Sequence, residues 1–132
     1  MSQIQGLGTQ IVECVRIAKL ISKHGESFLE RVYSSDEIRQ CSGSKHSTQM
    51  FAALWACKEA ILKMFGIEDR ARFDWREVEI SHRNGRHRPI FKGSLAEKSR
   101  QGPYRDWWIS YTYTRNYVTA TVIALGNVGN AD

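Results

Sequence analysis

Apolar positions in the N-terminal part of the chain recur at helical spacing. From Ile11 to Lys23 they form one stripe, and charged residues occupy much of the other side, which predicts an amphipathic helix that ends at Gly25. A short helix is expected over Ser27–Val32. Another is expected to begin at Ser34, because a glutamate three residues later completes the spacing of a capping box.

The longest helical pattern covers Ser47–Phe65 and is followed by Gly66, a residue suited to a left-handed C-terminal cap. Glu59 and Lys63 are four residues apart in this helix, so their side chains project from one side of it. The apolar face is predicted to consist of Phe51, Leu54, Trp55, Leu62 and Phe65.

After residue 70 the pattern changes to the alternation that is typical of strands. Two short runs, Phe73–Trp75 and Val78–Ile80, are out of phase, which predicts a bulge or bend near Arg76. Asn84-Gly85 predicts a tight hairpin, with a return strand over Pro89–Lys92.

Two further β-rich runs, Trp107–Tyr113 and Tyr117–Leu125, are joined by a predicted turn at 114–116. The segment 93–101 fits either a short helix or a loop, and a polar tail is expected from Gly126 onward. Helices therefore precede strands, which predicts an α+β fold with helices packed on an antiparallel sheet in one domain, residues 1–132.

Composition narrows the choice of partners. The chain has 132 residues, of which 42% are hydrophobic and 25% charged, so it is expected to fold as a globular domain. Its net charge of +5 favours an acidic partner. No apolar run is long enough to span a membrane, no signal-peptide pattern begins the chain, and three unevenly spaced cysteines favour a reducing cytoplasm.

Two segments carry a family resemblance. The first is Gly6-Leu7-Gly8-Thr9-Gln10-Ile11-Val12-Glu13, and the second runs from Phe51 to Gly66 with Lys58-Glu59-Ala60 at its centre. Together they resemble the small, trimeric holo-acyl-carrier-protein synthases of the 4′-phosphopantetheinyl transferase superfamily. That resemblance implies the transferase fold, a homotrimer with active sites between subunits, and transfer of the phosphopantetheine arm of coenzyme A to a serine of an acyl carrier protein.

The resemblance also implies a Mg²⁺ ion that bridges two acidic side chains and the diphosphate of coenzyme A. By position, Gln10 and Glu59 match the metal ligands, and Glu59 and Lys63 match the catalytic residues. The carrier protein is expected to dock on a basic helix face. The residues matched to that face are Arg16, Lys19 and Lys23, and those matched to coenzyme A are Lys58, Lys63, Gly66, Ser110 and Thr112.

Four departures from the family pattern lie close to the chemistry. Gln10 replaces an aspartate, and Leu54 replaces an arginine. Ile67-Glu68-Asp69 follows Gly66 in place of a Thr-Gly phosphate loop, and Tyr111 replaces a histidine. These departures define the alternative function: a catalytically impaired or repurposed homologue that binds a carrier protein or coenzyme A without transferring the arm.

Several residues have simpler interpretations. Glu59 and Lys63 could form an ordinary surface ion pair, Gly6 and Gly8 could mark a close approach of two backbones, and the basic helix face could be merely solvated. The basic hairpin over 83–92 could contact nucleic acid or coenzyme A phosphates. We favour a solvated surface there, and nucleic acid is not the expected partner.

Overall fold

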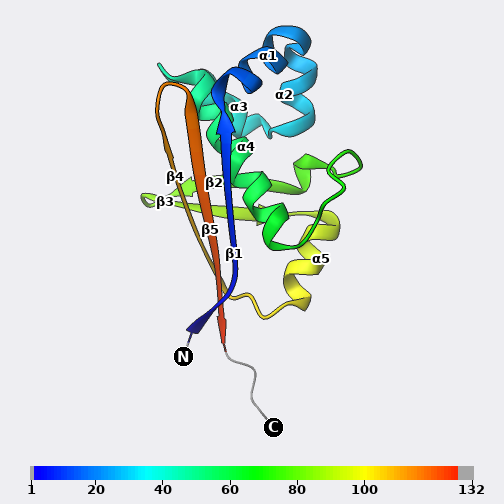
Figure 1. The fold of residues 1–132 in the computed structure, drawn as a ribbon. Helices are drawn as coiled ribbons and strands as arrows, with labels where there is room; N and C mark the ends of the chain where they lie inside the picture. The colour runs from blue at the N-terminus through cyan, green and yellow to red at the C-terminus, as the bar shows by residue number, and fades with distance from the viewer. Residues whose placement is uncertain (1, 128–132) are drawn as a thin grey trace.

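The computed structural model describes residues 2–127. A five-stranded antiparallel sheet has the order β1-β5-β4-β3-β2, and helices cover one of its faces (Figure 1). The strands are β1 (Ser2–Glu13), β2 (Val78–Arg83), β3 (Arg86–Phe91), β4 (Asp106–Tyr113) and β5 (Tyr117–Asn127). The helices are α1 (Cys14–His24), α2 (Glu26–Val32), α3 (Ser35–Ser42), α4 (Ser47–Met64), the short η1 (Trp75–Glu77) and α5 (Gly93–Gln101). The α+β class is confirmed.

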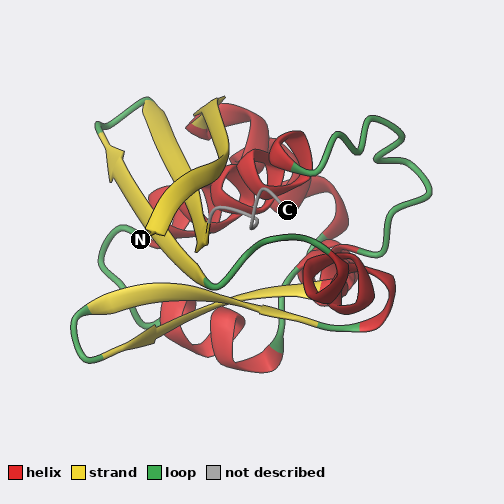
Figure 2. Cartoon of the chain, turned by 90° about the horizontal axis from the view of Figure 1, so that it is seen from below, coloured by secondary structure: helices red, strands yellow, loops and turns green. Residues whose placement is uncertain are grey.

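The sheet consists of two parts. Strands β1, β5 and β4 pair along most of their length, whereas β3 meets β4 at a single residue pair, His87 and Ile109. The β2–β3 hairpin therefore crosses the long strands at an angle (Figure 2). Its turn has positive φ at Asn84 and Gly85, as the sequence predicted.

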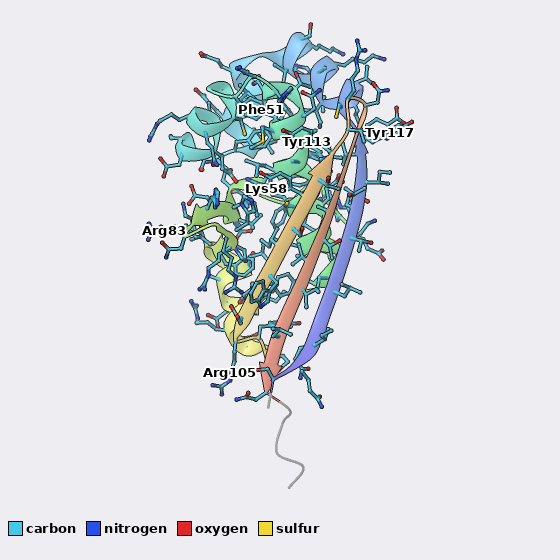
Figure 3. All side chains as sticks on the ribbon, turned by 90° about the vertical axis from the view of Figure 1, so that its left-hand side faces the viewer. Phe51, Lys58, Arg83, Arg105, Tyr113 and Tyr117 are labelled. Atoms are coloured by element: carbon cyan, nitrogen blue, oxygen red, sulfur yellow. The ribbon has the colours of Figure 1, made fainter. Side chains whose placement is uncertain are left out.

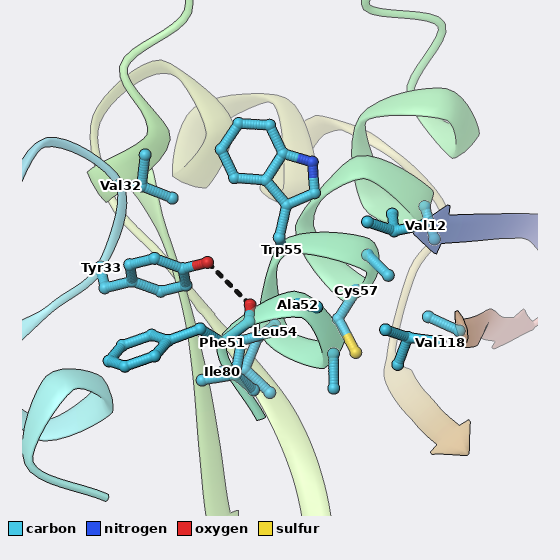
Figure 4. Close-up of a cluster of buried hydrophobic side chains, with 14 of the residues drawn as sticks. Val12, Val32, Tyr33, Phe51, Ala52, Leu54, Trp55, Cys57, Ile80 and Val118 are labelled. Carbon is cyan, nitrogen blue, oxygen red and sulfur yellow. Dashed lines mark hydrogen bonds between the residues drawn. The ribbon is translucent and has the colours of Figure 1, made fainter. Parts of the chain in front are cut away.

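Helix α4 is the centre of the core. Its twelve residues from Phe51 to Leu62 are all buried, because the long strands lie on one side and the other helices on the other. Tyr33, which follows α2, donates a hydrogen bond of 2.7 Å to the carbonyl oxygen of Phe51 within this core (Figure 4). Burial also raises the pKa of the Cys57 thiol to about 12, which suits a core residue rather than a nucleophile.

Two boundaries predicted from periodicity are wrong. The first helix begins at Cys14 rather than Ile11, because residues 11–13 continue β1 and pair with β5. The run Phe73–Trp75 is not a strand: residues 73 and 74 lie in a loop, and η1 begins at Trp75. Trp75 stacks on the Trp55 ring at 4.5 Å, so aromatic packing accounts for its burial.

The C-terminal predictions are mixed. The segment 93–101, for which the sequence allowed a helix or a loop, is the helix α5. Helix α3 has the predicted capping box. The strand β5 extends beyond Leu125 to Asn127, so Gly126 and Asn127 belong to the sheet instead of a polar tail. The rest of that expected tail, 128–132, lies outside the described residues.

Candidate functional site

The candidate site begins where β1 crosses α4. An ideal Cβ on Gly8 would lie 1.9 Å from the backbone oxygen of Ala60, and one on Gly6 would lie 2.7 Å from the sulfur of Met64. At Gly8 the obstacle is backbone, so only glycine allows this approach, whereas at Gly6 it is the Met64 side chain, which can move. Because alternate residues of a strand share a face, Gln10 faces the same helix two residues after Gly8.

Gln10 and Lys63 meet at this crossing. The Lys63 ammonium donates a hydrogen bond of 2.7 Å to Oε1 of Gln10. The helix continues to Gly66, whose φ of 74° is the left-handed conformation expected just after a helix end. A surface hollow beside the contact is lined by Thr9, Gln10, Ile11, Lys63, Thr119, Ala120 and Thr121.

Glu59 lies one turn before Lys63, and its carboxylate is almost completely buried. The indole of Trp55 donates a hydrogen bond of 2.6 Å to Oε1, and the guanidinium of Arg70 donates one of 2.9 Å to Oε2. Sequence reasoning missed Arg70, because its contact with Glu59 depends on how the loop after α4 folds back. The interpretation of Glu59 and Lys63 as an ordinary ion pair is not supported, because each has another partner.

Lys58 does not join these residues. Its side chain is fully buried, and Figure 3 labels it to one side of the long strands. The ammonium donates hydrogen bonds of 2.6 Å to the carbonyl of Val32 and 2.8 Å to the carboxylate of Glu37. Burial lowers the pKa of Lys58, and Glu37 opposes that shift. The structure thus places this predicted coenzyme A ligand in an internal ion pair.

Ser110 and Thr112 also lie apart from Lys63 within one chain. Both are exposed on β4, where they pair with Thr121 and Thr119 of β5. Strand β5 separates them from β1, so one copy of the chain does not bring them to Lys63.

The basic side chains predicted to dock a carrier protein do share a surface. Arg16, Lys19 and Lys23 are all exposed on α1 at spacings of three and four residues, which puts them on one helix face. A hollow beside this face includes Val15 and Tyr117 among its lining residues.

The departures from the family pattern have distinct environments. Leu54 is buried in the core, whereas Glu68 and Asp69 are exposed, and Asp69 faces Arg72 at 3.8 Å. Tyr111 is half-buried, and burial raises the pKa of its hydroxyl to about 12. A phenol with that pKa remains protonated near neutral pH.

Part of the positive charge of the basic hairpin is neutralised by an acidic side chain of β4. The guanidinium of Arg86 pairs with Asp106 at 3.1 Å and lies 3.5 Å from the ring centre of Trp108, so it is a structural cation. Arg83 and Arg88 remain exposed. Figure 3 shows Arg83 at the edge of the molecule.

The oxygen atoms of Gln10 and Glu59 are suitable ligands for a magnesium ion. Mg²⁺ in proteins commonly takes one or two protein oxygens and completes its shell with water and substrate phosphate. In the folded chain each side chain accepts a hydrogen bond from a cationic group, Gln10 from Lys63 and Glu59 from Arg70, so a metal ion would take the place of these cations at the oxygens. Among the described residues, no group of three or more His, Cys, Asp or Glu is arranged to hold a metal ion.

Within residues 2–127, no helix is long and apolar enough to cross a bilayer.

The match to a family model defines the class of protein. Residues 6–122 match the 4′-phosphopantetheinyl transferase superfamily, and the chain belongs to this family. A holo-acyl-carrier-protein synthase from Koribacter versatilis is 36% identical over 121 residues, which cover 91% of this chain and 97% of the relative.

Solved structures of such synthases have the same fold. The enzyme from Neisseria meningitidis has a TM-score of 0.80 and 26% identity, covering 92% of this chain and 98% of its own. The Helicobacter pylori synthase, solved in complex with coenzyme A, has a TM-score of 0.73 and 24% identity, covering 89% and 98%. Within this superfamily, the chain is similar to the holo-acyl-carrier-protein synthases.

Proposed function

We propose that this protein transfers the 4′-phosphopantetheine arm of coenzyme A to a serine of an apo-acyl carrier protein. The observation that carries the proposal is the Gln10–Lys63 contact at the crossing of β1 and α4, with Glu59 one turn earlier on the same helix, in a chain that belongs to this family. Full-length similarity to relatives named for this activity supports it.

In the proposed reaction, the serine oxygen forms a bond to the β-phosphorus of coenzyme A. The bond from that phosphorus to adenosine 3′,5′-bisphosphate breaks, and the serine proton is released. Lys63 holds the transferred phosphate. Its side chain is exposed and flexible, so the ammonium group can move its hydrogen bond from the Gln10 oxygen to a phosphate oxygen. Gly66, just after the helix end, leaves room for the diphosphate near Lys63.

Magnesium belongs to the same proposal, with Gln10 and Glu59 as its protein ligands. When bound, it supplies charge neutralisation for the diphosphate and the leaving group. Glu59 is held in one rotamer by Trp55, so its carboxylate is oriented before any ligand enters.

The test is a transfer assay with coenzyme A, Mg²⁺ and a panel of apo-carrier proteins, read by the mass increase of the carrier. We expect transfer by the natural chain and a loss of at least about 100-fold in Glu59→Gln and Lys63→Met. Lys98→Glu, a change at an exposed position of α5, is the control and should retain activity. A natural chain that is folded and inactive toward every carrier would contradict the proposal.

We infer that the active molecule is a homotrimer. The outer face of β1 carries Ile4, Leu7 and Ile11 at 64%, 58% and 62% exposure, which is unusual for apolar side chains in an isolated domain. A neighbouring copy on this face would bury them, and it could bring its Ser110 and Thr112 to Lys63 for binding coenzyme A. Light scattering should give three times the chain mass of 15.2 kDa, and Leu7→Arg should give the monomer and lose activity.

The carrier protein is proposed to dock on the α1 face of Arg16, Lys19 and Lys23. Charge attraction to an acidic carrier should make binding weaken with salt. Lys19→Glu should raise the KM for the carrier and leave the affinity for coenzyme A unchanged. A Lys98→Glu variant carries the same charge change on another helix and should match the natural protein.

A cytoplasmic location and a single domain over residues 1–132 belong to the same proposal. Cys14, Cys41 and Cys57 are buried free thiols, which suits a reducing compartment.

One observation favours the second candidate, a homologue that binds without transferring the arm. Gln10 brings no charge to the metal, and Glu59 is already paired with Arg70. Calorimetric titration with coenzyme A separates the two functions. Mg²⁺-dependent binding supports the transferase, whereas carrier binding with no coenzyme A binding supports the alternative.

A further inference from the structure

The carboxylate of Glu59 is paired with the guanidinium of Arg70 in the folded chain. Its side chain is 3% exposed, and both oxygens accept hydrogen bonds, one from the Trp55 indole and one from Arg70. A buried carboxylate is costly unless a nearby positive charge compensates it. The nearest lysine on the same helix side, Lys63, points to Gln10. Arg70 is therefore the group in direct contact that neutralises Glu59.

The Arg70 contact differs from a permanent structural ion pair. Arg70 lies in the loop between α4 and η1, and its side chain is 30% exposed. A single guanidinium nitrogen, Nη1, makes the contact with Glu59, and the buried Nε has no hydrogen-bond partner within residues 2–127. A bidentate arginine–carboxylate pair would be stronger and more rigid. The geometry is that of a contact that can be released by a loop movement.

The ion pair formed by Lys58 and Glu37 provides the internal comparison. Those side chains are 0% and 1% exposed, and backbone groups of Val32, Ser34 and Ile80 complete their hydrogen bonding. That pair lies fully inside the fold. Two neighbouring residues of one helix thus have one fixed and one exchangeable partner.

We propose that Arg70 is the resident counter-cation of Glu59 and that a divalent cation binds this carboxylate by displacing it. The inference rests on the proposed function, in which Glu59 is a metal ligand. Oε2 of Glu59 faces the guanidinium at 2.9 Å, and a divalent cation at the same oxygen would lie against a positive charge. Arg70 therefore holds the Glu59 carboxylate in place before loading, and it lowers the affinity of the site for metal.

The test measures metal affinity directly, with Mn²⁺ as the probe and no coenzyme A or carrier present. Free Mn²⁺ is followed by electron paramagnetic resonance in the natural chain, Arg70→Gln and Arg72→Gln. Arg72 is the matched control, because it is in the same loop, is 90% exposed and pairs with the exposed Asp69 instead of Glu59. We expect Arg70→Gln to bind Mn²⁺ at least about tenfold more tightly than the other two.

Thermal melting is the second measurement, and it shows whether the variants are folded. Without metal, Arg70→Gln should melt at a lower temperature than the natural chain, because Glu59 is left buried and unpaired. Added Mn²⁺ should raise its melting temperature more than it raises that of the natural chain. Arg70→Lys keeps the charge and should remain folded, with a Mn²⁺ affinity between the two.

Two results would overturn the inference. One is a folded Arg70→Gln that binds Mn²⁺ no more tightly than the natural chain, including the case in which neither binds it. The other is an equal gain in affinity in Arg72→Gln, which would indicate a general charge effect. The transfer assay on the natural chain decides the proposed function separately, so transfer with unchanged Mn²⁺ affinity in Arg70→Gln rejects only the counter-cation.

Discussion

Replacing Gly8 by alanine tests whether the crossing of β1 and α4 is a steric requirement. The added Cβ would lie 1.9 Å from the backbone oxygen of Ala60, whereas real Cβ contacts are essentially never under 3.0 Å. The strand must therefore move away from the helix by roughly 1 Å, since the obstacle is backbone and cannot rotate aside. Overpacking of this kind costs about 1–3 kcal/mol, and we expect a value near the upper end.

The assay is urea unfolding followed by tryptophan fluorescence, together with thermal melting. A loss of about 3 kcal/mol corresponds to a fall of roughly 10 °C in Tm for a domain of this size. Gly43→Ala is the matched control: its Cβ would meet nothing closer than 3.5 Å, so it should change stability by less than about 1 kcal/mol. If Gly8→Ala unfolds at the same urea concentration as Gly43→Ala, the steric reasoning is wrong.

Gly8→Ala also separates the two interpretations of the N-terminal glycines. Displacement of the strand carries Gln10 with it and should break the 2.7 Å contact with Lys63. A variant that loses stability and activity together supports the close-approach role. A variant that keeps its stability and loses only activity would assign Gly8 to substrate binding instead.

Three further predictions concern residues away from that crossing. Lys58→Met should lose about 3–5 kcal/mol in urea unfolding because it leaves Glu37 buried without a cation, and adding Glu37→Gln should recover part of the loss. Burial lowers the pKa of His87, and His82 adds to this. The unfolded chain therefore binds a proton first as pH falls below 6.5, so stability should decrease there, and His87→Gln should flatten that decrease. Ser34→Ala removes the cap of α3 and should cost about 1 kcal/mol, measured by thermal melting against a Ser35→Ala control.

Elements that depend on local signals were predictable from the sequence. The capping box of α3 and the Asn84-Gly85 turn each need only a few neighbouring residues, and both occur where predicted. The start of α1 was not predictable from periodicity. Residues 11–13 fit a helical stripe, but hydrogen bonding to β5 holds them in the sheet until Cys14. Pairing between segments far apart in the sequence decided that boundary.

The candidate site was predictable only in part for the same reason. The family resemblance assigned Gln10, Glu59 and Lys63 to one site, and the structure brings Gln10 into contact with Lys63 where Gly8 lets the strand approach the helix. It gave no indication of Arg70, whose contact with Glu59 depends on the path of a ten-residue loop. Loop paths of this length have no strong local signal.

The Lys58-Glu59 dipeptide shows why adjacent motif residues need not share a task. Successive residues of a helix point about 100° apart, so Lys58 enters the core toward Glu37 while Glu59 turns toward Trp55 and Arg70. The first charge pair ties α4 to α3 and contributes to the position of the helix, while the second leaves a partly exposed cation on a loop. A site whose carboxylate is held by a fixed scaffold and neutralised by a releasable arginine can be ordered before its metal arrives. For that reason the Mn²⁺ affinity of Arg70→Gln bears on how the site is loaded, whereas Lys58→Met bears on whether the helix is in place.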